Sequence, residues 1–319
     1  MTVEATETPV PAGALPGCAV VARMLGGSPA GTAAFMTSWL LIEYPGPWPS
    51  DALEQVLASA FSDSQRAVLE DLRTAGLRPL LIRQPGKHVR DVELHGRRIF
   101  VGGDGPDGRW MESFTIDSLS DLDSLDLRAI ASGRGGVGTP MSGPMFLVCT
   151  HGTKDMCCAL LGRPLAASLS GIHPGRAWEV SHVGGDRWAG NLLVVPDGYL
   201  HGQLDPAEAA NVAAAAMAGE VEPEHLRGRT GATNQWHQYA EIALRRHTGL
   251  RGLDDVQALS DTVVTTGLES EARLVHLRAG TAAFDLVISR RTTIGQGPSR
   301  CNALVAPSGY ITESITQVS

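Results

Sequence analysis

Short apolar runs and amphipathic stretches alternate along much of the chain, and their spacing predicts an α/β fold. Apolar residues recur at helical intervals after Ser50, which is suited to cap a helix, and Gly76 follows where that helix should end. In the first half the expected order is strand, helix, three strands and helix, at 39–44, 51–75, 79–83, 98–102, 110–116 and 119–132. The same order returns in the second half, at 145–149, 158–170, 177–182, 191–195, 199–203 and from Asp205 onward.

This repeated order predicts two thioredoxin-like α/β halves. The Gly- and Pro-rich segment between them contains G-x-G-x-x-G, but a helix precedes it and prolines follow, so it is interpreted as a linker. Farther along, a helix from Trp236 to about His247 and strands near 262–267, 272–278 and 282–290 indicate a C-terminal α+β extension. The expected domains are a flexible tail (1–17), an N-terminal thioredoxin-like domain (18–132), the linker (133–144), a second thioredoxin-like domain (145–218) and the extension (219–319).

Charge and composition argue against a nucleic-acid-binding protein and against a membrane-spanning one. The net charge of −8 over 319 residues argues against a nucleic-acid surface, and no apolar run approaches the roughly 20 residues of a membrane span. The first residues are acidic and contain prolines, unlike a signal or transit peptide, so a cytoplasmic location is expected. Five cysteines in a long chain do not form an evident disulfide framework, which favours thiols that act as ligands or catalysts.

The candidate chemistry lies in residues 145–195. Cys149 ends a predicted strand and Cys158 begins a predicted helix, whose N-terminus would stabilise a thiolate, while Cys157 would point elsewhere. His182 and Asp186 flank a double glycine in a second loop. Two thiolates, an imidazole and a carboxylate converging from two loops suggest a metal or cluster site.

Residues around these four have supporting roles in the same hypothesis. Gly184 and Gly185 would let the backbone come close to a bulky group. His151 would donate toward sulfur, and Asp155 would anchor the cysteine loop.

Plainer roles stay open for each candidate. Cys149 also suits a buried structural thiol, and His182 a structural residue. Asp186 also suits a turn residue that accepts backbone hydrogen bonds. The cysteine spacing lacks C-x-x-C and the tighter pairs usual in zinc sites, although the ligand types do not exclude zinc.

Three stretches carry a resemblance to a known family. They are W-L-L-I-E-Y-P-G-P-W (39–48), V-C-T-H-G-T-K-D-M-C-C (148–158) and W-E-V-S-H-V-G-G-D-R-W-A-G-N-L-L (178–193). Together they closely resemble the sucrase/ferredoxin-like family of thioredoxin-like ferredoxins, and the likeness covers about 18–205.

The resemblance implies a 2Fe–2S cluster held by two cysteines and two histidines. The family's cysteines match Cys149 and Cys158, and the first histidine of its H-V-G-G-H motif matches His182. The second histidine falls on Asp186, so the fourth ligand departs from the pattern. The expected activity is one-electron transfer between redox partner proteins, in an electron-transfer protein rather than a stand-alone enzyme. The alternatives are a relative with a lost or altered cluster, acting as a binding module or a cysteine-based enzyme, and a zinc-stabilised fold.

Overall fold

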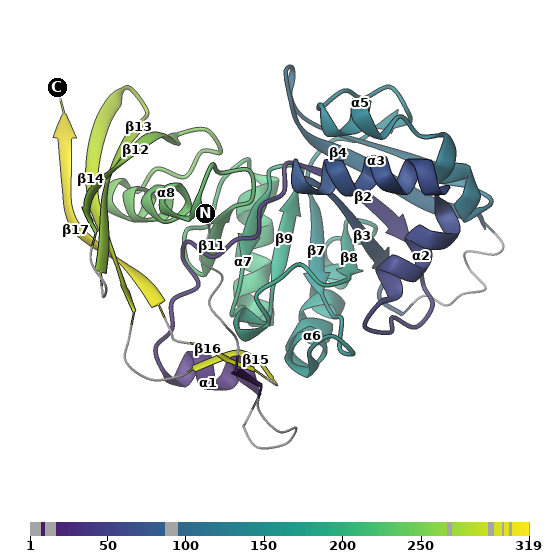
Figure 1. Ribbon diagram of the computed structural model, residues 1–319, viewed down its shortest axis with the longest axis horizontal. Coiled ribbons are helices and arrows are strands. Elements are labelled where there is room, and N and C mark those ends of the chain that lie inside the picture. The colour runs from purple at the N-terminus through teal and green to yellow at the C-terminus, as the bar shows by residue number, and fades with distance from the viewer. Residues whose placement is uncertain are drawn as a thin grey trace.

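A computed structural model describes residues 8–9, 17–86, 95–266, 270–292, 297–301, 303–305 and 308–318 (Figure 1). The mixture of helices and sheets confirms the predicted α/β class. The predicted tail over 1–17 lies outside the described residues, apart from Thr8, Pro9 and Gly17.

The first half follows the predicted order, except that each of its two predicted helices, over 51–75 and 119–132, is divided into two shorter helices. Its elements are β2 (Ser38–Glu43), α2 (Ala52–Ala60), α3 (Asp63–Thr74), β3 (Leu77–Arg83), β4 (Arg97–Gly105), β5 (Gly108–Ile116), the 3-10 helix η1 (Leu119–Ser124) and α5 (Leu127–Ala131). The helix predicted over 51–75 is therefore two helices. Phe61 is extended, and Ser62 caps α3 while its N–H and hydroxyl both donate to Asp123.

The second half also keeps its predicted order. It comprises β7 (Met145–Cys149), α6 (Met156–Ile172), β8 (Ala177–Val180), the 3-10 helix η2 (Asp186–Trp188), β9 (Leu192–Val195), β10 (Tyr199–His201), α7 (Pro206–Met217) and β11 (Leu226–Arg229). Asp205 and Glu208 form the capping box that starts α7. Because β8 ends at Val180, His182 lies in the following loop.

Both halves join into one ten-stranded sheet with the order β11-β10-β9-β7-β8-β3-β2-β4-β5-β6, where β6 is Thr139–Pro140 of the predicted linker. In each half the first two strands are parallel and the next ones antiparallel. The halves meet where β3 pairs with β8 through Ile82 opposite Val180 and Arg83 opposite Glu179. The domain boundaries stay a prediction.

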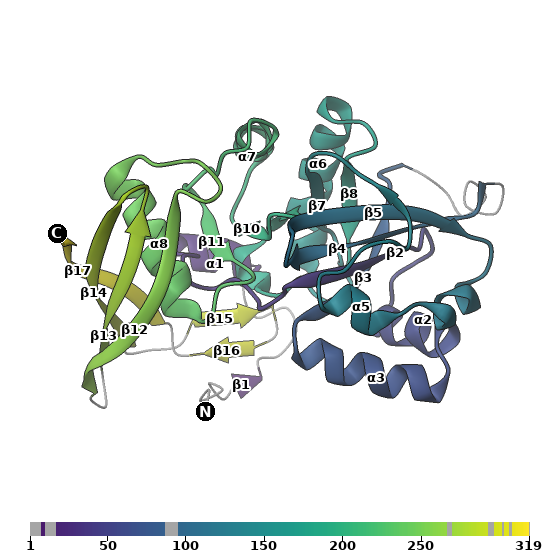
Figure 2. The ribbon, with the colours of Figure 1, turned by 90° about the horizontal axis from the view of Figure 1, so that it is seen from above.

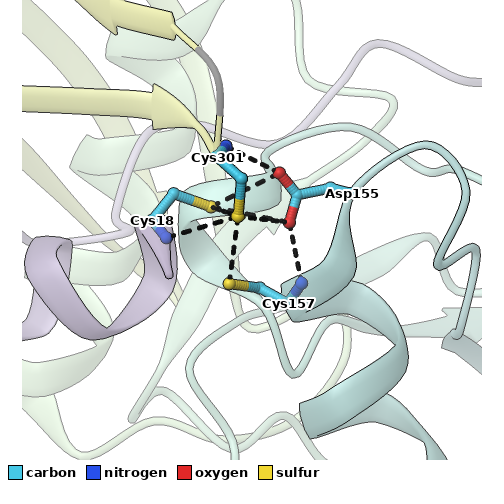
Figure 3. Close-up of side chains that lie close together, drawn as sticks. All are labelled: Cys18, Asp155, Cys157 and Cys301. Carbon is cyan, nitrogen blue, oxygen red and sulfur yellow. Dashed lines mark hydrogen bonds between the residues drawn. The ribbon is translucent and has the colours of Figure 1, made fainter. Parts of the chain in front are cut away.

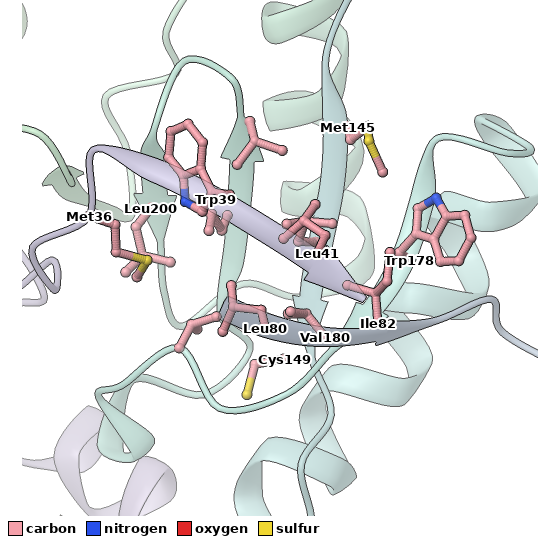
Figure 4. Close-up of a cluster of buried hydrophobic side chains, with 14 of the residues drawn as sticks. Met36, Trp39, Leu41, Leu80, Ile82, Met145, Cys149, Trp178, Val180 and Leu200 are labelled. Carbon is pink, nitrogen blue, oxygen red and sulfur yellow. The ribbon is translucent and has the colours of Figure 1, made fainter. Parts of the chain in front are cut away.

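The two faces of this sheet have different partners. One face is covered by α2, α3 and α5 in the first half and by α6 and α7 in the second. The sheet twists so strongly that these two helix groups lie on opposite sides of the molecule (Figure 2). On the other face, both halves contribute to one shared core, with Leu41 and Ile82 from the first and Leu147 and Val180 from the second. Cys149 lies at the edge of this core (Figure 4).

The C-terminal part is an α+β unit, as predicted. Helix α8 (Gln235–Thr248) packs on an antiparallel sheet of β12 (Val256–Thr266), β13 (Ser270–Ala279), β14 (Ala282–Thr292) and β17 (Ser308–Val318). Within the described ranges, no helix has both the length and the apolar character needed to cross a membrane.

Segments that are far apart in the sequence meet in a small sheet at the bottom of the view in Figure 1. Strands β1 (Thr8–Pro9), β15 (Gly297–Arg300) and β16 (Ala303–Val305) form a small sheet beside helix α1 (Cys18–Met24) (Figure 1). Cys301, at the turn between β15 and β16, is thereby brought next to Cys18.

Candidate metal centres

The two predicted cysteine ligands come together because α6 packs closely on the end of β7. Cys149 is the last residue of β7 and is buried. A Cβ atom on Gly162 would lie 2.1 Å from the carbonyl oxygen of Cys149, so only glycine permits this approach. The first turn of α6 then places Cys158, also buried, beside Cys149.

The double glycine shapes the loop that carries the other two candidates. Gly184 and Gly185 have φ angles of +85° and +76°, in the left-handed region that favours glycine. A Cβ atom on Gly185 would lie 2.3 Å from a guanidinium nitrogen of Arg227, which is therefore the bulky group that the loop accommodates. Arg227 is buried, and it donates to the carbonyl oxygen of Gly184 and to Oδ1 of Asn191, both at 2.8 Å. Sequence reasoning missed this residue because it lies outside both motifs.

The structure brings the predicted ligands into one group. The ligand atoms of Cys149, Cys158 and His182 all lie within 4.8 Å of one another. Asp186 is adjacent: its Oδ1 lies 3.5 Å from Sγ of Cys158 and 3.1 Å from Nδ1 of His182. We call these four residues the first group.

The imidazole of His182 has an unsatisfied nitrogen. Although Oδ1 of Asp186 is near, Nδ1 of His182 is buried without a hydrogen-bond partner of good geometry. A buried polar atom in this condition is costly unless another partner satisfies it. Together with two buried sulfur atoms, this donor set fits ligation of iron or zinc.

The electrostatics of the first group favour a thiolate at Cys149. A hydrogen bond from the Cys158 thiol lowers the pKa of Cys149 well below its usual value, although burial opposes this, and the same contact raises the pKa of Cys158. Burial lowers the pKa of His182, but contacts with Asp186 and Cys149 outweigh it and raise this pKa to about 9. Both shifts favour a thiolate at Cys149 beside an imidazolium at His182.

His151 and Asp155 were both predicted to support the first group, but the contacts of their side chains are with other residues. Nε2 of His151 lies 3.1 Å from the carbonyl oxygen of Pro49, and its ring packs edge-on against Trp48. Its backbone N–H, rather than its ring, lowers the pKa of Cys149 by hydrogen bonding. Asp155 caps α6 by accepting from the N–H of Cys157 at 2.9 Å, and its carboxylate faces a second group of cysteines.

This second group consists of Cys18, Asp155, Cys157 and Cys301, whose ligand atoms also all lie within 4.8 Å of one another (Figure 3). Sequence reasoning missed it because Cys18 and Cys301 are separated by almost the whole chain. The available signal was the count of cysteines: the first group uses two of five, and the structure gathers the other three.

Comparison with known proteins identifies one family. The model of the family described as sucrase/ferredoxin-like matches residues 29–228, which include all four residues of the first group. No curated protein and no solved structure matches the chain.

Proposed function

The chain belongs to the sucrase/ferredoxin-like family, and from this premise we propose that it carries single electrons on a 2Fe–2S cluster held by Cys149, Cys158 and His182, with Asp186 as the fourth ligand. The observation that carries the proposal is the convergence of two buried sulfurs and an imidazole nitrogen of His182 within 4.8 Å. When bound, such a cluster supplies one-electron chemistry, with a potential set by its ligands.

The residues in and around the first group would contribute to cluster binding in different ways. Contacts with Cys158 and His182 lower the pKa of Cys149 and so favour the thiolate form that binds metal. Arg227, fixed behind the double glycine, places a positive charge near the anionic sulfurs. A neutral imidazole ligand raises the reduction potential of the cluster relative to a thiolate ligand. With Asp186 in place of a second imidazole, the added negative charge would lower the potential.

His182 is the natural point of electron exchange with a partner. Its side chain is 26% exposed, whereas Cys149 and Cys158 are each 1% exposed. We propose that protein redox partners in the cytoplasm approach the cluster over this imidazole. The burial of Cys149 also disfavours an enzyme in which its sulfur attacks a substrate.

A single tetrahedral metal ion is the second candidate for the first group. The donor atoms are close enough together to surround one ion, as in a structural zinc site. Such an ion would stabilise the fold without transferring electrons.

Metal analysis separates the two candidates. Protein purified without oxygen should contain about two irons and two acid-labile sulfides per chain and should be brown, as expected for a 2Fe–2S centre. Cys158→Ser should abolish the visible spectrum, whereas Cys157→Ser should leave it nearly intact, because Cys157 belongs to the second group. A colourless protein with zinc in the first group would overturn the proposal. If the spectrum depended on Cys157 instead, the cluster would be assigned to the wrong group.

A further inference from the structure

We propose that Cys18, Cys157 and Cys301, together with Asp155, form a structural site for one tetrahedral divalent cation of the zinc class. The site is separate from the first group and would exist whether or not the first group holds a cluster. Its four side chains come from α1, the loop before α6, α6 itself and the turn between β15 and β16 (Figure 3).

The spacing of the donor atoms is that of a single coordination sphere. The sulfur of Cys301 lies 3.6 Å from that of Cys18 and 3.5 Å from that of Cys157. A tetrahedral ion with metal–sulfur bonds of about 2.3 Å requires sulfur–sulfur edges of about 3.8 Å. Two of the three sulfur–sulfur edges are thus close to the required length, and the third is no longer than 4.8 Å.

The carboxylate of Asp155 occupies the fourth vertex. Its Oδ1 lies 3.6 Å from the sulfur of Cys18 and 3.2 Å from that of Cys301. The N–H groups of Cys157 and Cys301 donate to its two oxygens at 2.9 and 2.8 Å. These bonds fix the orientation of the carboxylate and leave lone pairs for a metal, as hydrogen-bonded ligands do in metal sites.

The surroundings favour an anionic sulfur at Cys157 in particular. Cys157 lies in the first turn of the 17-residue helix α6, where the helix dipole stabilises a thiolate. The N–H of Cys18 points to the sulfur of Cys301 at 3.5 Å. A Cβ atom on Gly17 would lie 2.6 Å from the sulfur of Cys157, so the glycine leaves room for this sulfur beside the backbone.

A disulfide explains the arrangement less well than a metal. A disulfide joins two sulfurs at about 2.05 Å and would leave the third cysteine unpaired. Here all three sulfurs and a carboxylate oxygen surround a common point, and Cys18, Asp155 and Cys157 are buried. Three soft thiolates and one carboxylate oxygen around a common point are a donor set that zinc accepts.

Such an ion would link helix α1 and the turn between β15 and β16 to the start of α6. Cys18 and Cys301 are 283 positions apart, and each is tied through the ion to the start of α6. Binding would hold all three sulfurs as thiolates and release the protons that they still carry. The closure of such long loops would stabilise the folded chain.

Zinc content of the full-length chain tests the proposal. Cys18→Ser and Cys301→Ser should each lose about one zinc per chain, as expected for a single structural site. The matched variant Cys158→Ser should keep that zinc. Iron and sulfide should follow the opposite pattern, being lost in Cys158→Ser and kept in Cys301→Ser. A colourless protein that loses zinc only in the Cys18 and Cys301 variants would refute the electron-transfer proposal and support this one.

Cobalt substitution provides a second measurement that does not depend on the metal acquired in cells. In the Cys149→Ser/Cys158→Ser double variant, with folding checked by circular dichroism, added Co²⁺ should produce sulfur-to-cobalt charge-transfer bands and intense tetrahedral visible bands. Adding Cys301→Ser should weaken this binding at least tenfold. Unchanged zinc in both single variants, cobalt binding without charge-transfer bands, or a disulfide among the three cysteines in non-reducing mass spectrometry would each overturn the proposal.

Discussion

Asp186 stands where the resemblance to the family implies a histidine, and its surroundings allow two roles. Its carboxylate lies 3.1 Å from Nδ1 of His182 and 3.5 Å from the sulfur of Cys158. As a ligand it would bring negative charge directly to the metal. As a neighbour it would only orient and charge the imidazole of His182. The two roles differ in how the potential responds when the carboxylate is replaced.

Replacing Asp186 with histidine should therefore raise the reduction potential. If Asp186 ligates iron, Asp186→His exchanges an anionic donor for a neutral one, and the potential should rise by on the order of 100 mV. The potential of the variant should also fall more steeply at alkaline pH, because two imidazoles can then lose protons. A redox titration followed by the visible spectrum measures both effects.

The alanine variant is the control. Asp186→Ala should weaken cluster retention if the carboxylate is a ligand. If Asp186→Ala leaves the spectrum and potential unchanged while His151→Ala destroys the cluster, His151 rather than Asp186 supplies the fourth ligand.

At the scale of elements, the first turn of α6 serves both groups. Consecutive residues of a helix point about 100° apart, so Cys157 and Cys158 can belong to different centres although they are neighbours in sequence. The position of this turn depends on the contact between α6 and β7 at Gly162. Any change that separates the helix from the strand should disturb the first group.

Gly162→Ala should destabilise the protein and lower its metal content. The added methyl group would overlap the carbonyl oxygen of Cys149, and overpacking of this kind costs about 1–3 kcal/mol. Gly171→Ala, in the same helix, is the matched control: its Cβ would have no atom within 4 Å, and it should stabilise the helix by about 0.5–1 kcal/mol. Urea unfolding and metal analysis of both variants check this. Equal effects of the two changes would show that the contact at Gly162 is not critical.

Elements that depend on residues close together in sequence could be predicted from it, whereas elements that depend on contacts made only in the fold could not. Asp205 and Glu208 lie three residues apart, and their capping box was predicted. The break between α2 and α3 was missed because Ser62 is held by Asp123, which only the fold brings near. The first group was found because its ligands lie on neighbouring strand ends and loops. The second group was missed because Cys18 and Cys301 meet only after the chain has folded.

At the scale of the whole molecule, a short junction makes two half-sheets into one. Strands β3 and β8 share two residue pairs, and the side chains of one of them, Arg83 and Glu179, form an ion pair at 2.7 Å. Glu179 also accepts from the hydroxyl of Thr150 at 2.9 Å, next to Cys149. The pair is largely buried, with side-chain exposures of 19% and 12%. It therefore ties the first half directly to the strand end that carries the first group.

A double-mutant cycle should measure the interaction between Arg83 and Glu179. Arg83→Met and Glu179→Gln should each destabilise the protein, with a coupling energy on the order of 1 kcal/mol. The exposed pair Arg66 and Asp63 is the control, and its coupling should stay below about 0.5 kcal/mol because solvent screens it. Chemical denaturation measures all the variants. A coupling no greater than that of the exposed pair would mean that the sheet hydrogen bonds alone hold the junction.

The wide separation of Cys18 and Cys301 also has a consequence for the order of synthesis. On the ribosome, every side chain of the first group has been added once residue 186 is made, whereas Cys301 is added later. A nascent chain can therefore present the complete first group while the second still lacks a ligand. Closure of the second group would then mark a chain in which Cys18, Cys157 and Cys301 have all been made.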